Sequence, residues 1–143
     1  MAKIEFLGGL YLNDDGPCIP AHVIRGVLMG KGSAARKQKM RDKAELGLFI
    51  VKDARLEYDG LRKPLDLWKD ETFRFVTREK IGQASIMRTR PIFKIWKCEV
   101  EIEMNPDFIN EDTVDNLMES AGAECGLMER RPAFGRFKVT RID

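Results

Sequence analysis

The chain has 143 residues, of which 43% are hydrophobic and 34% are charged. This length and composition predict one globular domain with a buried core and argue against extended disorder. No apolar run approaches the roughly 20 residues that span a bilayer, and the first residues lack the apolar segment of a secretion signal. We therefore expect a cytoplasmic protein that does not bind membranes.

The cysteine and histidine content argues against disulfides and structural zinc. Cys18, Cys98 and Cys125 are odd in number and widely spaced, which suits a reducing compartment better than a disulfide framework. The chain has a single histidine and no closely paired cysteines, so a structural zinc site is not expected. It also lacks a cofactor-binding fingerprint, and we expect no cofactor.

The net charge of +2 conceals a strong separation of charge along the chain. Residues 25–43 hold seven basic residues against Asp42 alone, and residues 74–97 hold seven against Glu79 alone. Residues 99–119 carry eight acidic residues and no basic one. Each run by itself is also typical of an ordinary solvated surface, but two basic blocks in one small chain favour a polyanionic partner.

The first third of the chain predicts a strand, a helix and a basic connection. Residues 3–7 alternate around Ile4 and Phe6 and indicate a short strand. Pro20 suits the first turn of a helix, whose apolar stripe would be formed by Val23, Ile24, Val27 and Leu28. The polar stretch 33–45 is compatible with a second helix or with a loop. Residues 48–56 predict a second, buried strand.

The remainder predicts an insertion, a strand, a helix and a strand. Residues 58–91 hold no long periodic segment and are interpreted as an insertion, either a thumb-like hairpin or a loop. Residues 92–104 alternate over their whole length and predict the clearest strand. Asn110 suits a helix N-cap and Gly122 a helix end. Residues 135–142 predict the last strand.

The predicted order of elements is strand, helix, strand, insertion, strand, helix, strand. This is the split βαββαβ order of a ferredoxin-like, RRM-like fold of the α+β class. We expect one domain over residues 1–143, with a four-stranded antiparallel sheet and both helices on one of its faces. The other face of the sheet is then free for a partner.

Two glycine-bearing basic segments are candidates for phosphate binding. In RGVLMGKGSAARKQK, three glycines surround a basic tract that lacks the ending of a P-loop. In AGAECGLMERRPAFGRFKV, Gly126 and Gly135 bracket Arg130 and Arg131. Glycine lets a backbone approach phosphates closely, and guanidinium groups bind them in a forked geometry. The alternatives are a solvated basic helix for the first segment, and turns with arginines paired to the acidic run for the second.

The segment Ile19–Leu28, IPAHVIRGVL, resembles the I-P-x-x-x-[IL]-[KR]-G-x-[LI] signature that follows the first strand in the RAMP superfamily. This superfamily contains the RNA-binding backbone subunits of CRISPR effector complexes. The segment Gly126–Phe137 is similar to its glycine-rich loop, and residues 58–91 fall where such subunits carry a thumb-like hairpin. The chain is smaller than typical backbone subunits and also resembles small phage or prophage proteins.

The resemblance implies a non-catalytic protein that binds RNA or single-stranded DNA in a bacterial host cell. It implies side-by-side assembly along the strand, as a homo-oligomer or with CRISPR complex subunits, in which the acidic region of one copy meets the basic region of its neighbour. The residues expected to bind nucleic acid are Arg25, Lys31, Arg36, Lys37, Lys39, Arg41, Arg88, Arg90, Gly126, Arg130, Arg131 and Arg136.

Two alternative functions stay open. The first is a RAMP-type endoribonuclease that uses His22 as a general base, or Asp14 and Asp15 with a metal. A histidine on a helix surface and two turn-forming aspartates are the simpler interpretation. The second is a phage decoy that docks onto a host CRISPR complex. Aromatic candidates for base stacking are Trp68, Phe73, Phe75, Phe93 and Phe134.

Overall fold

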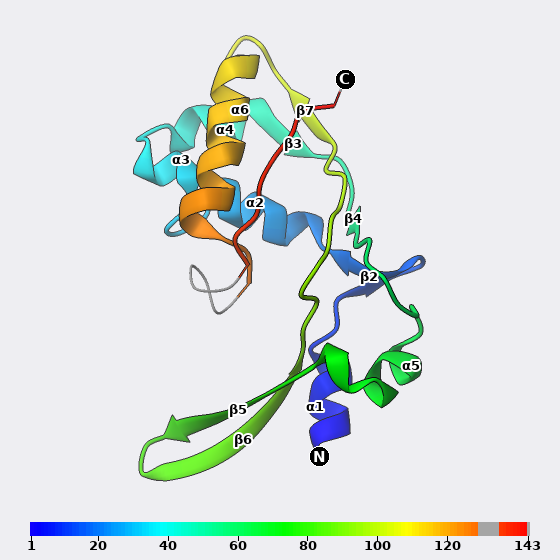
Figure 1. The fold of residues 1–143 in the computed structure, drawn as a ribbon. Coiled ribbons are helices and arrows are strands. Elements are labelled where there is room, and N and C mark those ends of the chain that lie inside the picture. The colour runs from blue at the N-terminus through cyan, green and yellow to red at the C-terminus, as the bar shows by residue number, and fades with distance from the viewer. Residues whose placement is uncertain (129–134, 143) are drawn as a thin grey trace. The chain divides into compact units, whose positions relative to one another are not determined.

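The computed structural model describes residues 1–128 and 135–142. They form a mixed α+β structure of helices and small antiparallel sheets (Figure 1). The chain divides into two compact units, each built from two stretches of sequence. Unit 1 comprises Met1–Ile19 and Ala54–Glu99, and unit 2 comprises Pro20–Asp53 and Val100–Asp143.

Unit 1 contains two helices, a 3-10 turn and two sheets. Its elements are α1 (Ala2–Gly8), β1 (Leu12–Asn13), β2 (Gly16–Ile19), β4 (Ala54–Arg55), α5 (Pro64–Lys69), η1 (Glu71–Phe73), β5 (Arg74–Ile81) and β6 (Ala84–Pro91). Strand β2 lies between β1 and β4, and β5 pairs with β6 along its whole length. The range predicted to be an insertion therefore contains a long hairpin.

The strand predicted over residues 3–7 is wrong, because this segment forms helix α1. Phe6 is its one fully buried apolar side chain, and Leu10, which follows the helix, is buried as well. They form the core of unit 1 together with Leu67 of α5. Ile4, which defined the alternation, is 75% exposed. Short apolar segments of this kind do not distinguish the two periods by themselves.

Arg62 holds the turn and strand segments of unit 1 together. Its Nε donates to the carbonyl of Asp15 at 2.9 Å, and its two terminal nitrogens donate to the carbonyls of Leu56 at 2.7 Å and Pro17 at 3.0 Å. The guanidinium carbon also lies 5.3 Å from the ring centroid of Tyr58. One planar fork therefore satisfies three main-chain acceptors from two distant stretches of sequence.

The described residues of unit 2 form four helices, a π-helical turn and one two-stranded sheet. Its elements are α2 (Ala21–Met29), α3 (Ala34–Lys37), α4 (Arg41–Gly47), β3 (Leu48–Ile50), β7 (Ile102–Met104), α6 (Glu111–Ser120) and η2 (Ala121–Cys125). Helices α2 and α6 confirm the two predicted helices. The core of the unit includes Val27 and Leu28 of α2 and Leu117 of α6, all nearly fully buried.

The single strand predicted over residues 48–56 is wrong. Residues 48–50 form β3 and pair with β7 in unit 2, whereas residues 54–55 form β4 and pair with β2 in unit 1. Between them, the carboxylate of Asp53 accepts a hydrogen bond from the backbone N–H of Ala21 at 2.8 Å. Asp53 thus caps α2, whose N-cap residue is a proline without a side-chain acceptor.

Helix α6 begins as predicted, but it does not end at Gly122. The side chain of Asn110 accepts from the backbone N–H of Thr113 at 2.8 Å, and the chain continues past Ser120 into η2. Gly122 has another role, since a Cβ there would collide with the main-chain carbonyl of Phe137. The backbone N–H of Phe137 donates to the Gly122 carbonyl at 3.0 Å. The glycine therefore allows close approach of the C-terminal segment.

The long strand predicted over residues 92–104 is wrong except at its end. Only Ile102–Met104 form a strand, and an isolated bridge joins Lys97 to Glu57. Residues 135–142 form no strand in the part of the chain that the structure describes. Alternation favours extended backbone, but a ladder also needs a neighbouring strand in register. The described residues form three small sheets in place of one four-stranded sheet.

We expect the substitution Arg62→Met to destabilise unit 1 by about 3 kcal/mol, because three main-chain acceptors lose charge-assisted donors. Urea unfolding followed by circular dichroism measures the change. Arg55→Met is the matched control: Arg55 is exposed and forms only a loose 3.8 Å pair with Glu57, so its loss costs about 0.5 kcal/mol or less. Equal effects of the two substitutions contradict the assignment.

Candidate nucleic-acid interface

Seven of the basic residues of unit 2 lie on one continuous stretch of helices and short connections. We call this stretch the α2–α4 surface. Its cations are Arg25, Lys31, Arg36, Lys37, Lys39, Arg41 and Lys43. All seven side chains are exposed. The sequence prediction named six of them, and the structure places all six in the same unit.

The local fold of the α2–α4 surface explains why its cations point to solvent. Ser33 caps α3, and its hydroxyl accepts from the backbone N–H of Arg36 at 3.3 Å. Ser33 and the next two residues, Ala34 and Ala35, are completely or almost completely buried. With only four residues in α3, burying its small first residues leaves Arg36 and Lys37 on the outer side.

The charges of the α2–α4 surface are largely unneutralised. Arg41 pairs with Glu45 one helical turn away at 3.0 Å. Within the described residues, the other six cations form no ion pair. Exposed cations on adjacent short helices produce a positive potential that attracts phosphates and falls with ionic strength.

Gly26 leaves open space on helix α2 beside Arg25. A Cβ at Gly26 would meet nothing within 4 Å, and its φ is not in the left-handed region. Among the described residues, neither packing nor backbone conformation therefore requires a glycine here. A glycine inside a helix costs about 1 kcal/mol relative to alanine.

The α2–α4 surface borders an acidic region at the end of α6. An open depression there is lined by Gln38 of unit 2 and by Asn116, Glu119, Ser120 and Glu124. Two carboxylates repel phosphate oxygens. We therefore do not expect phosphate to bind in this depression.

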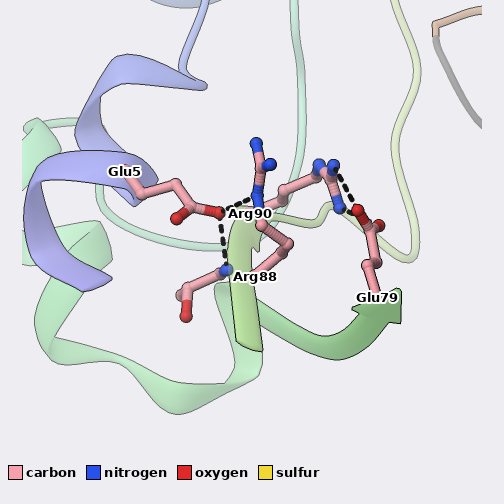
Figure 2. Close-up of polar contacts among 5 residues, drawn as sticks. Glu5, Glu79, Arg88 and Arg90 are labelled. Atoms are coloured by element: carbon pink, nitrogen blue, oxygen red, sulfur yellow. Dashed lines mark hydrogen bonds and ion pairs between the residues drawn. The ribbon is translucent and has the colours of Figure 1, made fainter. Parts of the chain in front are cut away.

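Arg88 and Arg90 occupy a different setting in unit 1, where both form close ion pairs (Figure 2). Arg88 Nε lies 2.8 Å from a carboxylate oxygen of Glu5. The two terminal nitrogens of Arg90 lie 2.7 and 3.4 Å from the carboxylate oxygens of Glu79 across the hairpin. Their side chains are only 25–35% exposed. Both arginines thus hold unit 1 together.

Glu5 joins helix α1 to the hairpin. The oxygen that binds Arg88 also accepts the backbone N–H of Thr89 at 3.0 Å (Figure 2). The hydrogen bond from Arg88 is the main reason that the pKa of Glu5 lies below its usual value. Desolvation opposes this effect and raises the pKa, and the hydrogen bond from Thr89 lowers it further. The carboxylate occupies a main-chain donor at the edge of β6 and protects that edge from other strands.

The second glycine-bearing segment is described only at its two ends. The backbone N–H of Leu127 donates to the Gly135 carbonyl at 3.0 Å, and Gly126 and Gly135 both have positive φ. The two described ends of this segment are therefore joined by a backbone hydrogen bond. Arg136 is exposed beyond it. Arg130, Arg131 and Phe134 lie outside the described residues.

The candidate catalytic residues lie in different units. His22 is exposed on α2 of unit 2. Asp14 and Asp15 form the two-residue turn between β1 and β2 of unit 1, where the side chain of Asn13 accepts the backbone N–H of Asp15 at 2.9 Å. This is the turn-forming role of such residues. In the described part of the chain, no three His, Cys, Asp or Glu residues lie together as metal ligands.

Most aromatic candidates for base stacking belong to the packing of unit 1. Phe73 and Phe93 pack against Tyr58 with ring centroids 5.5 and 4.8 Å apart. Trp68 packs against the buried Phe6 at 5.5 Å and carries the guanidinium of Arg74 on its ring. These rings stabilise a small core and are not free to stack on bases.

The ion-pair partners of Arg88 and Arg90, which distinguish the basic block of unit 1 from that of unit 2, were not predicted from the sequence. Glu5 is far from Arg88 in sequence, and nothing in its neighbourhood indicates an ion pair. Glu79 carries a signal, because it is the single acidic residue within the block 74–97. A hairpin through that block places it across from the second strand.

Comparison of the chain with protein-family models, with curated proteins and with solved structures found no match. No helix among residues 1–128 and 135–142 has the length and apolar character needed to cross a membrane.

We expect the contribution of Glu5 to stability to depend on pH. Since its pKa in the folded protein is lowered, its ion pair stabilises fully above the usual value of 4.5 and is lost as pH falls through the folded-state pKa. Thermal melting of wild type and Glu5→Gln should differ most near neutral pH and converge in acid. Glu71→Gln is the control, because Glu71 is 91% exposed. A gap that persists unchanged in acid contradicts the assignment.

Proposed function

We propose that this protein binds RNA or single-stranded DNA without cleaving it, and that the α2–α4 surface is the main binding site. The observation that carries the proposal is the set of exposed cations on this surface without an ion-pair partner among the described residues. Phosphate contacts supply most of the free energy of sequence-independent binding. Glycines beside Arg25 and Lys31 allow a sugar–phosphate backbone to approach the chain closely.

The contrast between the two basic blocks supports this choice of surface. In unit 1, Arg88 and Arg90 are held by Glu5 and Glu79. If Arg88 and Arg90 bound phosphates, their two close ion pairs with Glu5 and Glu79 would be broken. In unit 2, binding a phosphate replaces only water and counterions around the cations, which is favourable at low salt. We therefore propose a structural role for Arg88 and Arg90.

We also propose the finer assignment to a small, RAMP-like, ferredoxin-like protein of the CRISPR backbone type. Its support is that α2, β3, β7 and α6 occur in this order in unit 2, with α3 and α4 between α2 and β3, and that β3 pairs antiparallel with β7. This is the central helix–strand–strand–helix part of the βαββαβ order. The segment Ile19–Leu28 runs from the end of β2 into α2, and a backbone hydrogen bond joins Leu127 to Gly135.

The test is the binding of a labelled single-stranded RNA to the full chain by fluorescence anisotropy at a series of salt concentrations. We expect Lys31→Gln/Arg36→Gln/Lys37→Gln to weaken binding by about 10- to 100-fold. It should also lower the slope of log affinity against log salt by about 2, because three phosphate contacts are lost. The DNA strand of the same sequence, as a second probe, shows which nucleic acid is preferred.

The matched control carries the same change of net charge in unit 1. In Lys3→Gln/Lys63→Gln/Lys69→Gln, all three substituted side chains are exposed. This control should keep the salt slope of the wild type. Equal weakening by both triple substitutions, or a wild-type affinity that does not fall with salt, would rule out the α2–α4 surface.

Gly26→Ala should separate stability from binding. We expect it to raise the free energy of unfolding by about 0.5–1 kcal/mol and to weaken RNA binding about tenfold, because a methyl group then stands where the strand approaches. Gly8→Ala is the control: Gly8 is also a helical glycine with open space around it, but it belongs to α1 in unit 1. A more stable Gly26→Ala protein with unchanged affinity contradicts the role given to Gly26.

A further inference from the structure

The two faces of the β5–β6 hairpin differ in how their charges are satisfied. One face carries Glu79, Arg88 and Arg90, which are engaged in the ion pairs of Figure 2. On the other face, Arg78 and Lys80 of β5 are exposed and form no ion pair within the described residues. In unit 1, the turn of the hairpin lies clear of α1 (Figure 1), so this second face is open towards its tip.

Exposed apolar side chains lie next to these two cations. Met87 is the cross-strand neighbour of Arg78 and is 55% exposed, and Val76 is 52% exposed. We call Val76, Arg78, Lys80 and Met87 the basic hairpin face. It combines one row of cations with adjacent apolar surface.

Unit 2 has a sheet face of the opposite charge. Phe49 of β3 is the cross-strand neighbour of Glu103 in β7, and the backbone N–H of Val51 donates to the carbonyl of Glu101 at 3.1 Å. Phe49 is 54% and Val51 44% exposed. Both carboxylates are also exposed. We call Phe49, Val51, Glu101 and Glu103 the acidic sheet face.

The two faces are complementary in spacing as well as in charge. Arg78 and Lys80 are two residues apart and lie on the same face of their strand, and so do Glu101 and Glu103. In extended backbone the Cα atoms of each pair are about 6.8 Å apart. In the acidic sheet face, Phe49 and Val51 lie in a row beside the carboxylates. In the basic hairpin face, Val76 precedes the cations on β5 and Met87 lies opposite Arg78. Glu101 has one competing cation, Lys52, at a loose 3.9 Å, and Glu103 pairs with no cation among the described residues.

We propose that the basic hairpin face of one copy of this chain docks onto the acidic sheet face of a second copy. The contact joins different surfaces on the two copies, so it is heterologous and leads to rings or filaments. It assigns residues to the side-by-side assembly that the sequence resemblance implies, and it does not depend on nucleic-acid binding by the α2–α4 surface. The cations that bind nucleic acid on the α2–α4 surface take no part in it.

The test is sedimentation velocity of the nuclease-treated full chain across the micromolar range. We expect the average sedimentation coefficient of the wild type to rise with protein concentration at low salt. It should return to the monomer value at high salt, because salt screens the contact. Both Arg78→Glu/Lys80→Glu and Glu101→Lys/Glu103→Lys should be monomers when examined separately.

Mixing the two charge-reversed proteins decides between contacts within and between chains. In the mixture, each reversed hairpin face meets a reversed sheet face on the other variant, and the unreversed faces also match. We expect association to return in the mixture. Lys3→Glu/Lys69→Glu is the control for charge alone and should associate like the wild type. Circular dichroism of each variant checks that it is folded.

Three outcomes overturn the proposal: a monomeric wild type at all concentrations, association that disappears on nuclease treatment, and a mixture that stays monomeric. Docking of the hairpin within its own chain, or onto nucleic acid, gives one of these outcomes. RNA affinity of Arg78→Glu/Lys80→Glu, measured against the charge control, reports separately on the proposed function. If this variant binds RNA as tightly as the control but no longer associates, the proposed nucleic-acid binding stands and the hairpin acts in assembly alone.

Discussion

The pairing of arginine with nearby carboxylates is the interaction on which the organisation of this small protein depends. In unit 1, Glu5 binds Arg88 and Glu79 binds Arg90, both at less than 3 Å. These bonds fix helix α1 and the two strands of the hairpin to one another. A two-stranded hairpin has little stability without such support. Arg88 and Arg90 therefore form ion pairs within unit 1, whereas most cations of the α2–α4 surface in unit 2 form none among the described residues.

Arg62 stabilises unit 1 in a related way, with main-chain carbonyls in place of carboxylates. Its fork binds the Asp14–Asp15 turn, strand β2 and the residue after β4. The core of this unit is built around Phe6, Leu10 and Leu67 with a few aromatic rings beside them. A small core buries limited apolar area, so directional polar bonds carry a larger share of the stability.

Unit 2 distributes its polar groups differently. Its helix caps are Ser33 on α3 and Asn110 on α6, which are local, and the carboxylate of Asp53 on α2, which is 32 residues from Ala21. These caps need no arginine or lysine, and the exposed cations of α2, α3 and α4 are therefore available to a ligand. Most of the described acidic residues of the unit lie between residues 101 and 124, where Arg141 engages Glu111 and Asp115 of α6. Basic and acidic surfaces thus stay separate within one chain.

The sequence alone determined the features that depend on neighbouring residues. The apolar stripe of α2, the cap at Asn110, the turn at Asp14–Asp15 and the exposed basic tract 25–43 all follow from local spacing and charge. Partners distant in sequence were decided only by the tertiary structure. Residues 3–7 became a helix because Phe6 and Leu10 face Leu67, and residues 48–56 divided because their two ends pair with different strands. Arg88, a predicted nucleic-acid ligand, forms an ion pair with Glu5, which is 83 residues away in sequence. Such a pair requires proximity in space and leaves no periodic signal in the sequence.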